Sequence, residues 1–189
     1  YVQGTGRLTA PNAVTVGGDT LVGRHVVLAT GSVARSLPDL DIGGRVMTSD
    51  QALQLDWIPN SVIVLGGGVI GVEFASVWKS FGSEVTIIEA LPRLVPAEDE
   101  ACSKALERAF RKRKIGFRTG VRFASATQDG DQVSVTLEDG TVLTADLLLV
   151  AVGRGPNTTD MGFEAQGVAM DRGWVLTDDH LQTNVPNVY

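Results

Sequence analysis

Short uninterrupted runs of apolar residues mark the strands of this chain. Residues 62–65 read Val-Ile-Val-Leu, residues 85–88 read Val-Thr-Ile-Ile, and residues 148–150 read Leu-Leu-Val. Strands that are buried on both faces lack the apolar-polar alternation of a half-buried strand, because neither side meets water. The runs therefore predict central strands of a parallel sheet.

The segments between these runs predict two helices. Residues 69–81 are apolar almost all round, as in a helix buried between a sheet and another layer, and Phe81-Gly82 provides the stop. A second helix is expected to open at Glu98-Asp99-Glu100 and to close at Arg-Lys-Arg-Lys, residues 111–114. This charge order complements the helix dipole at both ends. The basic cluster could be a partner surface, but a solvated helix end is the favoured interpretation.

Residues 121–150 alternate between apolar and polar positions, with turn signals at Asp129-Gly130 and Asp139-Gly140. This pattern predicts a three-stranded antiparallel β-meander that leads into the last central strand. The expected fold class is α/β: a Rossmann-like three-layer fold with a parallel central sheet, crossover helices and the meander.

A glycine-rich turn joins the first apolar run to its helix. It reads Gly66-x-Gly68-x-x-Gly71, and Glu89 follows directly after the run 85–88. The first glycine allows a tight turn, the second lets the backbone approach a pyrophosphate, and the third lets the helix pack close to the strand. The helix N-terminus then offers unpaired N–H groups to the phosphates. Because strands flank the motif on both sides, it indicates a dinucleotide site.

Glu89 selects between the two nicotinamide dinucleotides. A carboxylate at this position can accept hydrogen bonds from both ribose hydroxyls and would repel a 2′-phosphate. Arg93 lies four residues on and could soften that repulsion, but Glu89 is better placed. NAD is therefore the expected cofactor.

An internal repeat relates residues 26–31, Val-Val-Leu-Ala-Thr-Gly, to residues 148–153, Leu-Leu-Val-Ala-Val-Gly. Each copy is expected to be a short hairpin that feeds a central strand ending in Ala-x-Gly. Gly66 lies 87 residues before Gly153, and the equivalent glycine of the first copy would fall before residue 1. The repeat indicates two related nucleotide-binding units, the first of them partial.

Composition excludes several function classes. The chain has 189 residues, 43% of them hydrophobic, and a net charge of −6, which argues against a nucleic-acid surface. No apolar run reaches the ~18 residues that span a bilayer, and no signal peptide opens the chain, so we expect a cytoplasmic protein without a membrane partner. The start at Tyr1, without a methionine, hints at a fragment.

Cysteine and histidine usage is sparse. Cys102 is the only cysteine, so there is no disulfide framework and no redox pair. His25 and His180 are far apart in the sequence and lack a nucleophile nearby, so both are expected to be structural. These residues do not have metal-ligand spacing, and no metal is expected.

Four segments together resemble the FAD/NAD-linked pyridine nucleotide-disulfide oxidoreductases, and most closely the dihydrolipoamide dehydrogenases. They are residues 29–32 (ATGS), 64–73 (VLGGGVIGVE), 151–158 (AVGRGPNT) and 183–189 (TNVPNVY). The resemblance implies an enzyme that oxidises dihydrolipoamide, carried on a lipoyl protein or a 2-oxoacid dehydrogenase complex. Electrons would pass through a disulfide and FAD, and then as hydride to NAD. Such enzymes are expected to be homodimers.

The resemblance implies a Rossmann-like three-layer FAD/NAD-binding fold, and it also assigns domains and binding residues. Residues 1–48 would be a partial FAD-binding segment, 49–153 the NAD-binding domain, and 154–189 a return segment toward the FAD-binding domain. The expected NAD contacts are Gly66, Gly67, Gly68, Val69, Ile70 and Gly71 at the pyrophosphate, Glu89 at the ribose, Val121 at the adenine and Gly153 near the nicotinamide. The expected FAD contacts are Gly6, Ala29, Thr30, Gly31 and Ser32, with a purely structural role for Gly6 equally open.

Two charged residues carry open alternatives. Glu73 is the only ionisable residue between Val62 and Trp78, and a buried unpaired carboxylate is costly, so a functional partner is expected. The resemblance implies the nicotinamide-side ribose, while the alternative is a carboxylate stabilised by first-turn helix N–H groups. Arg154 either contacts a cofactor, which is favoured, or pairs with a surface carboxylate.

The resemblance further implies that the redox cysteines precede Tyr1 and that an acid/base histidine with its glutamate follows Tyr189. This polypeptide alone, with no catalytic residue of its own, is therefore predicted not to catalyse the overall reaction. Two alternatives stay open. One is the same domain from a relative such as soluble transhydrogenase, mercuric reductase or NADH oxidase, and the other is a non-catalytic nucleotide-binding module.

Overall fold

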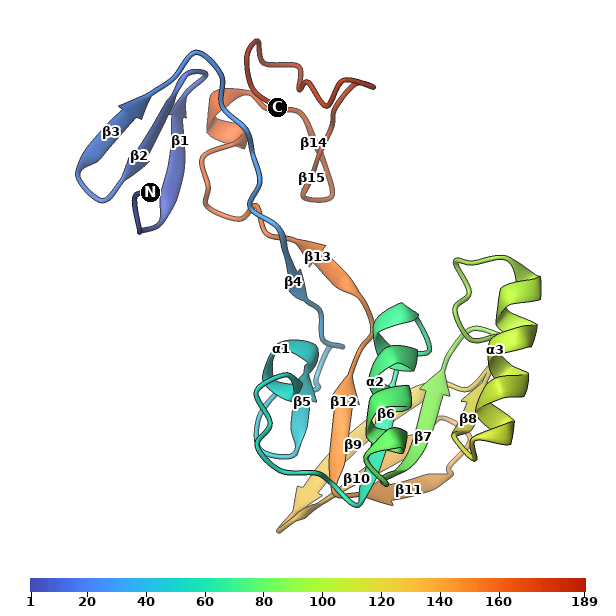
Figure 1. Cartoon of the computed structure of the whole chain (residues 1–189). Coiled ribbons are helices and arrows are strands. Elements are labelled where there is room, and N and C mark those ends of the chain that lie inside the picture. The colour runs from blue at the N-terminus through green and yellow to red at the C-terminus, as the bar shows by residue number, and fades with distance from the viewer. The chain divides into compact units, whose positions relative to one another are not determined.

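The computed structural model describes all 189 residues and divides them into two compact units (Figure 1). The first unit comprises residues 1–33 and 155–189, and the second comprises residues 34–154. The chain passes from one unit to the other through β4 (Ser32–Ala34) and β13 (Arg154–Pro156), which pair with each other. None of the helices is both long enough and apolar enough to span a lipid bilayer.

The second unit is built on a five-stranded sheet in the order β5-β12-β6-β7-β8. All neighbouring strands are parallel, as the apolar runs predict. The strands are β5 (Val46–Thr48), β12 (Leu147–Val150), β6 (Ser61–Leu65), β7 (Glu84–Glu89) and β8 (Gly116–Thr119). The three predicted central runs are therefore adjacent strands in the middle of this sheet.

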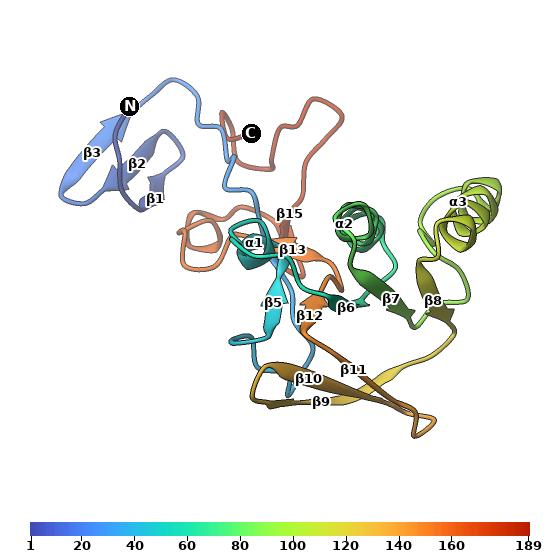
Figure 2. The same cartoon turned by 60° about the horizontal axis from the view of Figure 1, so that its bottom comes forward.

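Helices cover one face of this sheet and a meander covers the other (Figure 2). The helices are α1 (Ser49–Ala52), α2 (Val69–Ser80) and α3 (Glu100–Lys112). The meander consists of β9 (Phe123–Asp129), β10 (Gln132–Leu137) and β11 (Val142–Ala145), in the antiparallel order β11-β10-β9. The predicted three-layer α/β fold and its meander are confirmed.

Successive residues of β6 enter two separate cores. Val62 and Val64 pack among the helices, whereas Ile63 and Leu65 pack against the meander. All four side chains are buried, and each fully buried side chain of this size stabilises the fold by roughly 1.5–3 kcal/mol. A strand with water on neither side needs no polar positions, which explains the uninterrupted apolar run.

The outer face of α2 departs from the sequence prediction. Val72, Ala75 and Trp78 are buried as expected, but Val69 is 54% exposed and Val77 is 48% exposed. The sequence predicts that α2 is buried on all sides, and this prediction is wrong for the face that carries Val69 and Val77. In the second unit only the sheet side of α2 is covered.

The basic end of α3 makes specific intramolecular contacts. The Arg113 guanidinium donates to the carbonyl oxygen of Ser76 at 3.0 Å and to the hydroxyl of Ser80 at 2.9 Å, both in α2. Arg111 lies 4.7 Å from the ring centre of Phe117. At the other end of α3, the pKa of Glu100 is lowered. The largest cause is a hydrogen bond from Lys104, and the second is the positive charge of that lysine. The two arginines thus tie the helix end to its neighbours, although both stay exposed.

The first unit contains two small antiparallel sheets. One has the order β1-β2-β3, from β1 (Gly6–Ala10), β2 (Ala13–Val16) and β3 (Asp19–Val22), and the other joins β14 (Met170–Asp171) to β15 (Trp174–Val175). A single-turn helix, η1 (Glu164–Gln166), lies between them in sequence. Leu8, Phe163, Val168, Val185 and Val188 form the core of this unit.

The two copies of the internal repeat differ in outcome. Both begin with the expected hairpin, β2–β3 in the first copy and β10–β11 in the second. The second hairpin leads into β12, but the first leads only to an isolated bridge between Val26 and Val188, so the predicted central strand at residues 26–31 is wrong. A strand needs ladder partners: β12 has one on each side, whereas Val26 pairs on one side only.

Candidate functional site

Packing explains why the first and last glycines of the turn carry no side chain. Gly66 has a φ of +112°, and a β-carbon there would overlap the carbonyl oxygen of Ala151. A β-carbon on Gly71 would overlap the carbonyl oxygen of Gly66. The helix is therefore held against the turn at a distance that only glycine permits, as the motif predicts.

Gly68 differs from these two glycines because its environment is open. It is the N-cap residue of α2, with φ −73° and ψ −177°, and a β-carbon there would meet no atom within 4 Å. This conformation is open to any residue, so backbone geometry does not require glycine here. Free space in front of the backbone is the condition for close approach by a ligand.

Gly67 is also constrained, although the motif leaves its position unspecified. A β-carbon would lie 2.7 Å from the Leu94 Cδ2 and 3.0 Å from the Glu89 Cβ. Its N–H donates to the Glu89 Oε2 at 2.6 Å, and its carbonyl accepts from the Val95 N–H at 2.7 Å. The turn is thus held from both sides, by the end of β7 and by the loop that follows it.

The Glu89 carboxylate braces this turn. Glu89 is the last residue of β7 and is only 9% exposed. Besides the bond from Gly67, its Oε1 accepts from the Leu91 N–H at 2.7 Å. A carboxylate offers about four acceptor positions, so two backbone bonds leave it able to accept further hydroxyl donors. The backbone bonds also fix its orientation.

Two pockets meet at the glycine turn and Glu89. The Val121 pocket, of about 400 Å³, is lined mainly by apolar side chains and includes Leu65, Gly66, Ile88, Glu89, Val121 and Val152. The Gly68 pocket, of about 550 Å³, includes Gly66, Gly68, Val69, Glu89, Gly153 and Arg154. Gly66, Glu89 and Val152 belong to both. Most of the sequence-predicted NAD residues therefore lie along one continuous site.

Arg93 is turned away from a ligand role by its own hydrogen bonds. Its guanidinium donates to the carbonyl oxygens of Pro96 and Glu98 and to the Ser103 hydroxyl, each at 2.8 Å. The side chain thus ties the loop after β7 to the start of α3. Its donors are directed at this loop, and so the geometry favours Glu89 as the charge that a ribose would meet.

Val95 is a part of the site that sequence reasoning missed. It is buried and lines the Gly68 pocket, and it has a φ of +42°. Positive φ is strained for a β-branched residue, so the surroundings must hold it there. The hydrogen bond from its N–H to Gly67 and the neighbouring Leu94, which is fully buried, supply that hold. Neither Val95 nor the following proline signals a left-handed residue.

Glu73 does not have the burial on which its sequence argument rested. It is exposed and lies in the second turn of α2, since the helix starts at Val69 and has no acidic residue in its first turn. It lines a surface groove with residues such as Ser76 and Leu106, apart from the two pockets at the glycine turn. The premise of a buried carboxylate is wrong, and a contact with the nicotinamide-side ribose stays a prediction.

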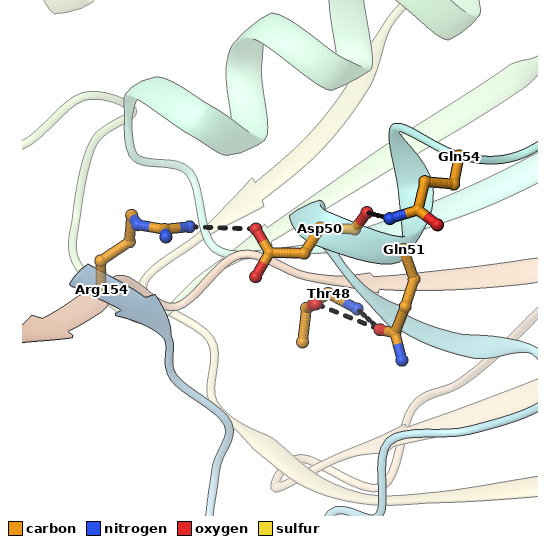
Figure 3. A network of polar contacts seen from close by, with 5 residues as sticks. All are labelled: Thr48, Asp50, Gln51, Gln54 and Arg154. Atoms are coloured by element: carbon orange, nitrogen blue, oxygen red, sulfur yellow. Dashed lines mark hydrogen bonds and ion pairs between the residues drawn. The ribbon is translucent and has the colours of Figure 1, made fainter. Parts of the chain in front are cut away.

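Arg154 pairs with a surface carboxylate, which is one of the two alternatives for this residue, and its contact with a cofactor stays a prediction. It lines the Gly68 pocket, and its Nη1 lies 3.4 Å from the Oδ1 of Asp50 (Figure 3). The neighbouring Gly153 has a φ of +124° and lines the same pocket. Asp50 was not foreseen, because no sequence motif links it to Arg154.

The predicted FAD-contacting residues all belong to the first unit, with Ser32 at its edge in β4. Gly31 has a φ of +74°, and its carbonyl accepts from the Asn157 N–H at 3.1 Å. The Thr30 carbonyl accepts from the Asn157 side chain at 3.1 Å. Gly6 starts β1, where a β-carbon would make ordinary contact with Val14. A flavin role for Gly6 and for Ala29, Thr30, Gly31 and Ser32 stays a prediction.

Neither histidine joins the glycine-turn site. The His25 ring lies 5.8 Å from the Tyr189 ring, edge to face, and the His180 N–H donates to Asp178 at 2.9 Å. No group of three or more histidine, cysteine or carboxylate side chains is placed to hold a metal ion. The ionisable residues that line the two pockets are Glu89, Glu98, Arg122, Glu138 and Arg154.

Comparison with known proteins places this geometry in a family. A dihydrolipoamide dehydrogenase of Chaetomium thermophilum is 38% identical over the whole chain, and a dihydrolipoyl dehydrogenase of Cupriavidus necator is 37% identical. The chain spans 40% and 42% of the length of these two relatives. The structure of the HOCl-induced flavoprotein disulfide reductase RclA from Escherichia coli matches all of the chain with a TM-score of 0.90 at 30% identity, over 44% of its own length.

The family model for pyridine nucleotide-disulphide oxidoreductases matches residues 1–189, the entire chain. The chain therefore belongs to the pyridine nucleotide-disulphide oxidoreductase family.

Proposed function

We propose that the second unit binds NAD as the hydride-accepting domain of a flavoprotein that oxidises dihydrolipoamide. The observation that carries this proposal is the position of Glu89, a buried carboxylate held by two backbone N–H groups at the junction of two pockets. Gly68, whose backbone faces open space, lines one of these pockets together with Glu89. Together these features suit a ribose next to a pyrophosphate.

The two pockets suggest how a dinucleotide lies along the site. Its adenine would enter the apolar Val121 pocket, and its adenosine ribose would meet Glu89. The pyrophosphate would lie over Gly68 at the N-terminus of α2, where backbone N–H groups and the helix dipole favour anions. The remaining half would extend through the Gly68 pocket toward Gly153.

The charges around Glu89 favour NAD over NADP. A 2′-phosphate would lie against the Glu89 carboxylate, and two unit charges about 4 Å apart repel by about 1 kcal/mol in bulk water and about 4 kcal/mol near a protein surface. Arg93, the nearest cation in sequence, has its guanidinium directed at Pro96, Glu98 and Ser103. Arg122, the one cation that lines the Val121 pocket with Glu89, is exposed, whereas Glu89 is buried and oriented by two backbone N–H groups.

The activity of the whole enzyme is proposed from the relatives. The relatives from Chaetomium thermophilum and Cupriavidus necator are named dihydrolipoamide dehydrogenase and dihydrolipoyl dehydrogenase, and the family uses FAD and a nicotinamide dinucleotide. FAD, when bound, would supply the hydride donor. The residues of this chain would bind and orient the acceptor, with a lipoyl carrier or a 2-oxoacid dehydrogenase complex as the electron source. The parent enzyme is proposed to be a homodimer.

Calorimetric titration with NADH and with NADPH tests this proposal. We expect the wild type to prefer NADH, and we expect Glu89→Gln to reduce the preference about tenfold because it removes the charge that repels a 2′-phosphate. Glu84→Gln is the matched control, because Glu84 opens the same strand and is exposed. Equal wild-type affinity for the two nucleotides, or an effect of Glu84→Gln as large as that of Glu89→Gln, would contradict the role of Glu89.

A further inference from the structure

The carboxyl ends of two adjacent strands bring Asp50 and Arg154 together. β5 and β12 are parallel neighbours, with Thr48 opposite Val150. α1 begins directly after β5 and carries Asp50, while Arg154 follows shortly after β12. Residues more than a hundred positions apart in sequence therefore form an ion pair, with 3.4 Å between the Arg154 Nη1 and the Asp50 Oδ1 (Figure 3).

Local hydrogen bonds hold Asp50 in place. The backbone N–H of Thr48 donates to the Gln51 Oε1 at 2.8 Å, and the Thr48 hydroxyl donates to the same atom at 3.1 Å. The Gln54 side-chain amide donates to the Asp50 carbonyl at 3.3 Å (Figure 3). α1 is a single short turn, and these side-chain bonds add to its backbone hydrogen bond from the Leu53 N–H to the Ser49 carbonyl at 3.1 Å. Asp50 thus projects from an anchored turn.

Arg154 is the only cationic residue that lines the Gly68 pocket. The other ionisable residues of its lining are Glu89 and Glu98, both acidic. A guanidinium stays protonated and has five N–H donors in a rigid fork, so it can pair with a carboxylate and also donate to a ligand oxygen. The Arg154 side chain is about one-third exposed. It therefore lies where both protein and ligand can reach it.

We propose that Arg154 binds the nicotinamide-riboside half of the dinucleotide through its oxygen acceptors. We further propose that Asp50 is a positioning residue that holds the Arg154 guanidinium at that end of the pocket. This inference rests on the proposed function, since it follows from an adenosine ribose at Glu89 and a pyrophosphate at Gly68. With these groups so placed, the Gly153–Arg154 end is left for the second nucleoside.

A purely structural pair is the competing explanation. In that case the ion pair would only fasten α1 to the segment after β12, and its loss would change stability or would weaken all ligands alike. The two explanations differ in how they treat a ligand that lacks nicotinamide. ADP-ribose retains the adenosine, the pyrophosphate and the second ribose but has no nicotinamide, and ADP ends at the pyrophosphate.

The test is calorimetric titration of the full chain with NADH, ADP-ribose and ADP, with thermal unfolding measured in parallel. We expect Arg154→Gln to weaken NADH binding about tenfold, as for loss of a hydrogen bond to a charged group, and to leave ADP binding within about twofold of the wild type. The loss measured with ADP-ribose separates ribose contacts from nicotinamide contacts. Asp50→Asn should weaken NADH binding about threefold, the effect of an exposed pair, and Asp50→Glu should restore it.

The double variant tests whether Asp50 acts through Arg154. In the Arg154→Gln background, Asp50→Asn should have no further effect on NADH binding, because the group it positions is gone. Glu100→Gln is the control, since it removes an exposed pair with Lys104 (2.7 Å) on α3 and should leave all three affinities unchanged.

Equal losses for NADH and ADP, or no loss for either, would overturn the role of Arg154. An Asp50→Asn effect that persists without Arg154 would overturn the positioning role of Asp50. Failure of the wild type to bind any of the three ligands would instead refute the proposed function, and this inference would fall with it.

Discussion

Replacing Gly68 by alanine separates ligand binding from folding more cleanly than any other change at the site. The backbone of Gly68, at φ −73° and ψ −177°, suits alanine, and the added methyl group would meet no protein atom within 4 Å. Because alanine restricts the unfolded chain, the variant should be as stable as the wild type or more stable by about 0.4–1 kcal/mol.

The same methyl group should impair NADH binding. It would stand in the Gly68 pocket, where the pyrophosphate must approach the backbone N–H groups. Loss of one charge-assisted hydrogen bond, with displacement of the phosphate, corresponds to about 2–3 kcal/mol, or a roughly 30- to 150-fold higher Kd.

Calorimetry with NADH measures this change, and thermal unfolding followed by circular dichroism reports on the fold. Gly18→Ala is the matched control, because a β-carbon on Gly18 is also free of contacts and Gly18 lies in the β2–β3 turn of the first unit. It should leave NADH binding unchanged. A Gly68→Ala variant that is folded and binds NADH like the wild type would refute a pyrophosphate at this turn.

Three further results are expected. Gly71→Ala should destabilise the second unit by about 2 kcal/mol, because the new β-carbon overlaps the Gly66 carbonyl, and an unchanged melting temperature would show that the close packing is not required. Arg93→Met should loosen the loop that holds Gly67 and so weaken NADH binding, but the ratio of NADH to NADPH affinity should stay within about twofold of the wild-type ratio. A larger change in this ratio, measured by titration, would mean that Arg93 contacts the 2′ position of the ribose. The chain alone should not reduce NAD with dihydrolipoamide, because Cys102 is its only cysteine and a disulfide relay needs two thiols. NADH formation, followed by its absorbance, at a rate above that of the enzyme-free reaction would contradict this prediction.

Several elements of the second unit could be predicted because their patterns are local. The uninterrupted run at Val62–Leu65 reports burial on both faces, and the Asp-Gly turns of the meander report positive φ at Gly130 and Gly140, which the structure has. Glu89 could be placed next to the turn because β6 and β7 are parallel neighbours, which brings their carboxyl ends to one edge of the sheet.

Sequence patterns gave wrong predictions where the structure of a segment depends on the other segments that pack or pair with it. Residues 26–31 have the composition of a central strand, but a strand forms only beside partners, and Val26 has one on a single side. Glu73 was expected to be buried because its neighbours in sequence are apolar. Only one face of α2 packs on the sheet, however, and Glu73 lies on the other.

The α/β fold class, the glycine turn and the acidic residue that follows it could be predicted because each is encoded in residues close together along the chain. The rest of the site depends on contacts that form only in the folded protein. Val95 and Leu94 against Gly67, and Asp50 beside Arg154, are contacts between segments that no local pattern connects. They arise because neighbouring parallel strands deliver their following residues to the same edge of the sheet, and strand order is a property of the whole fold.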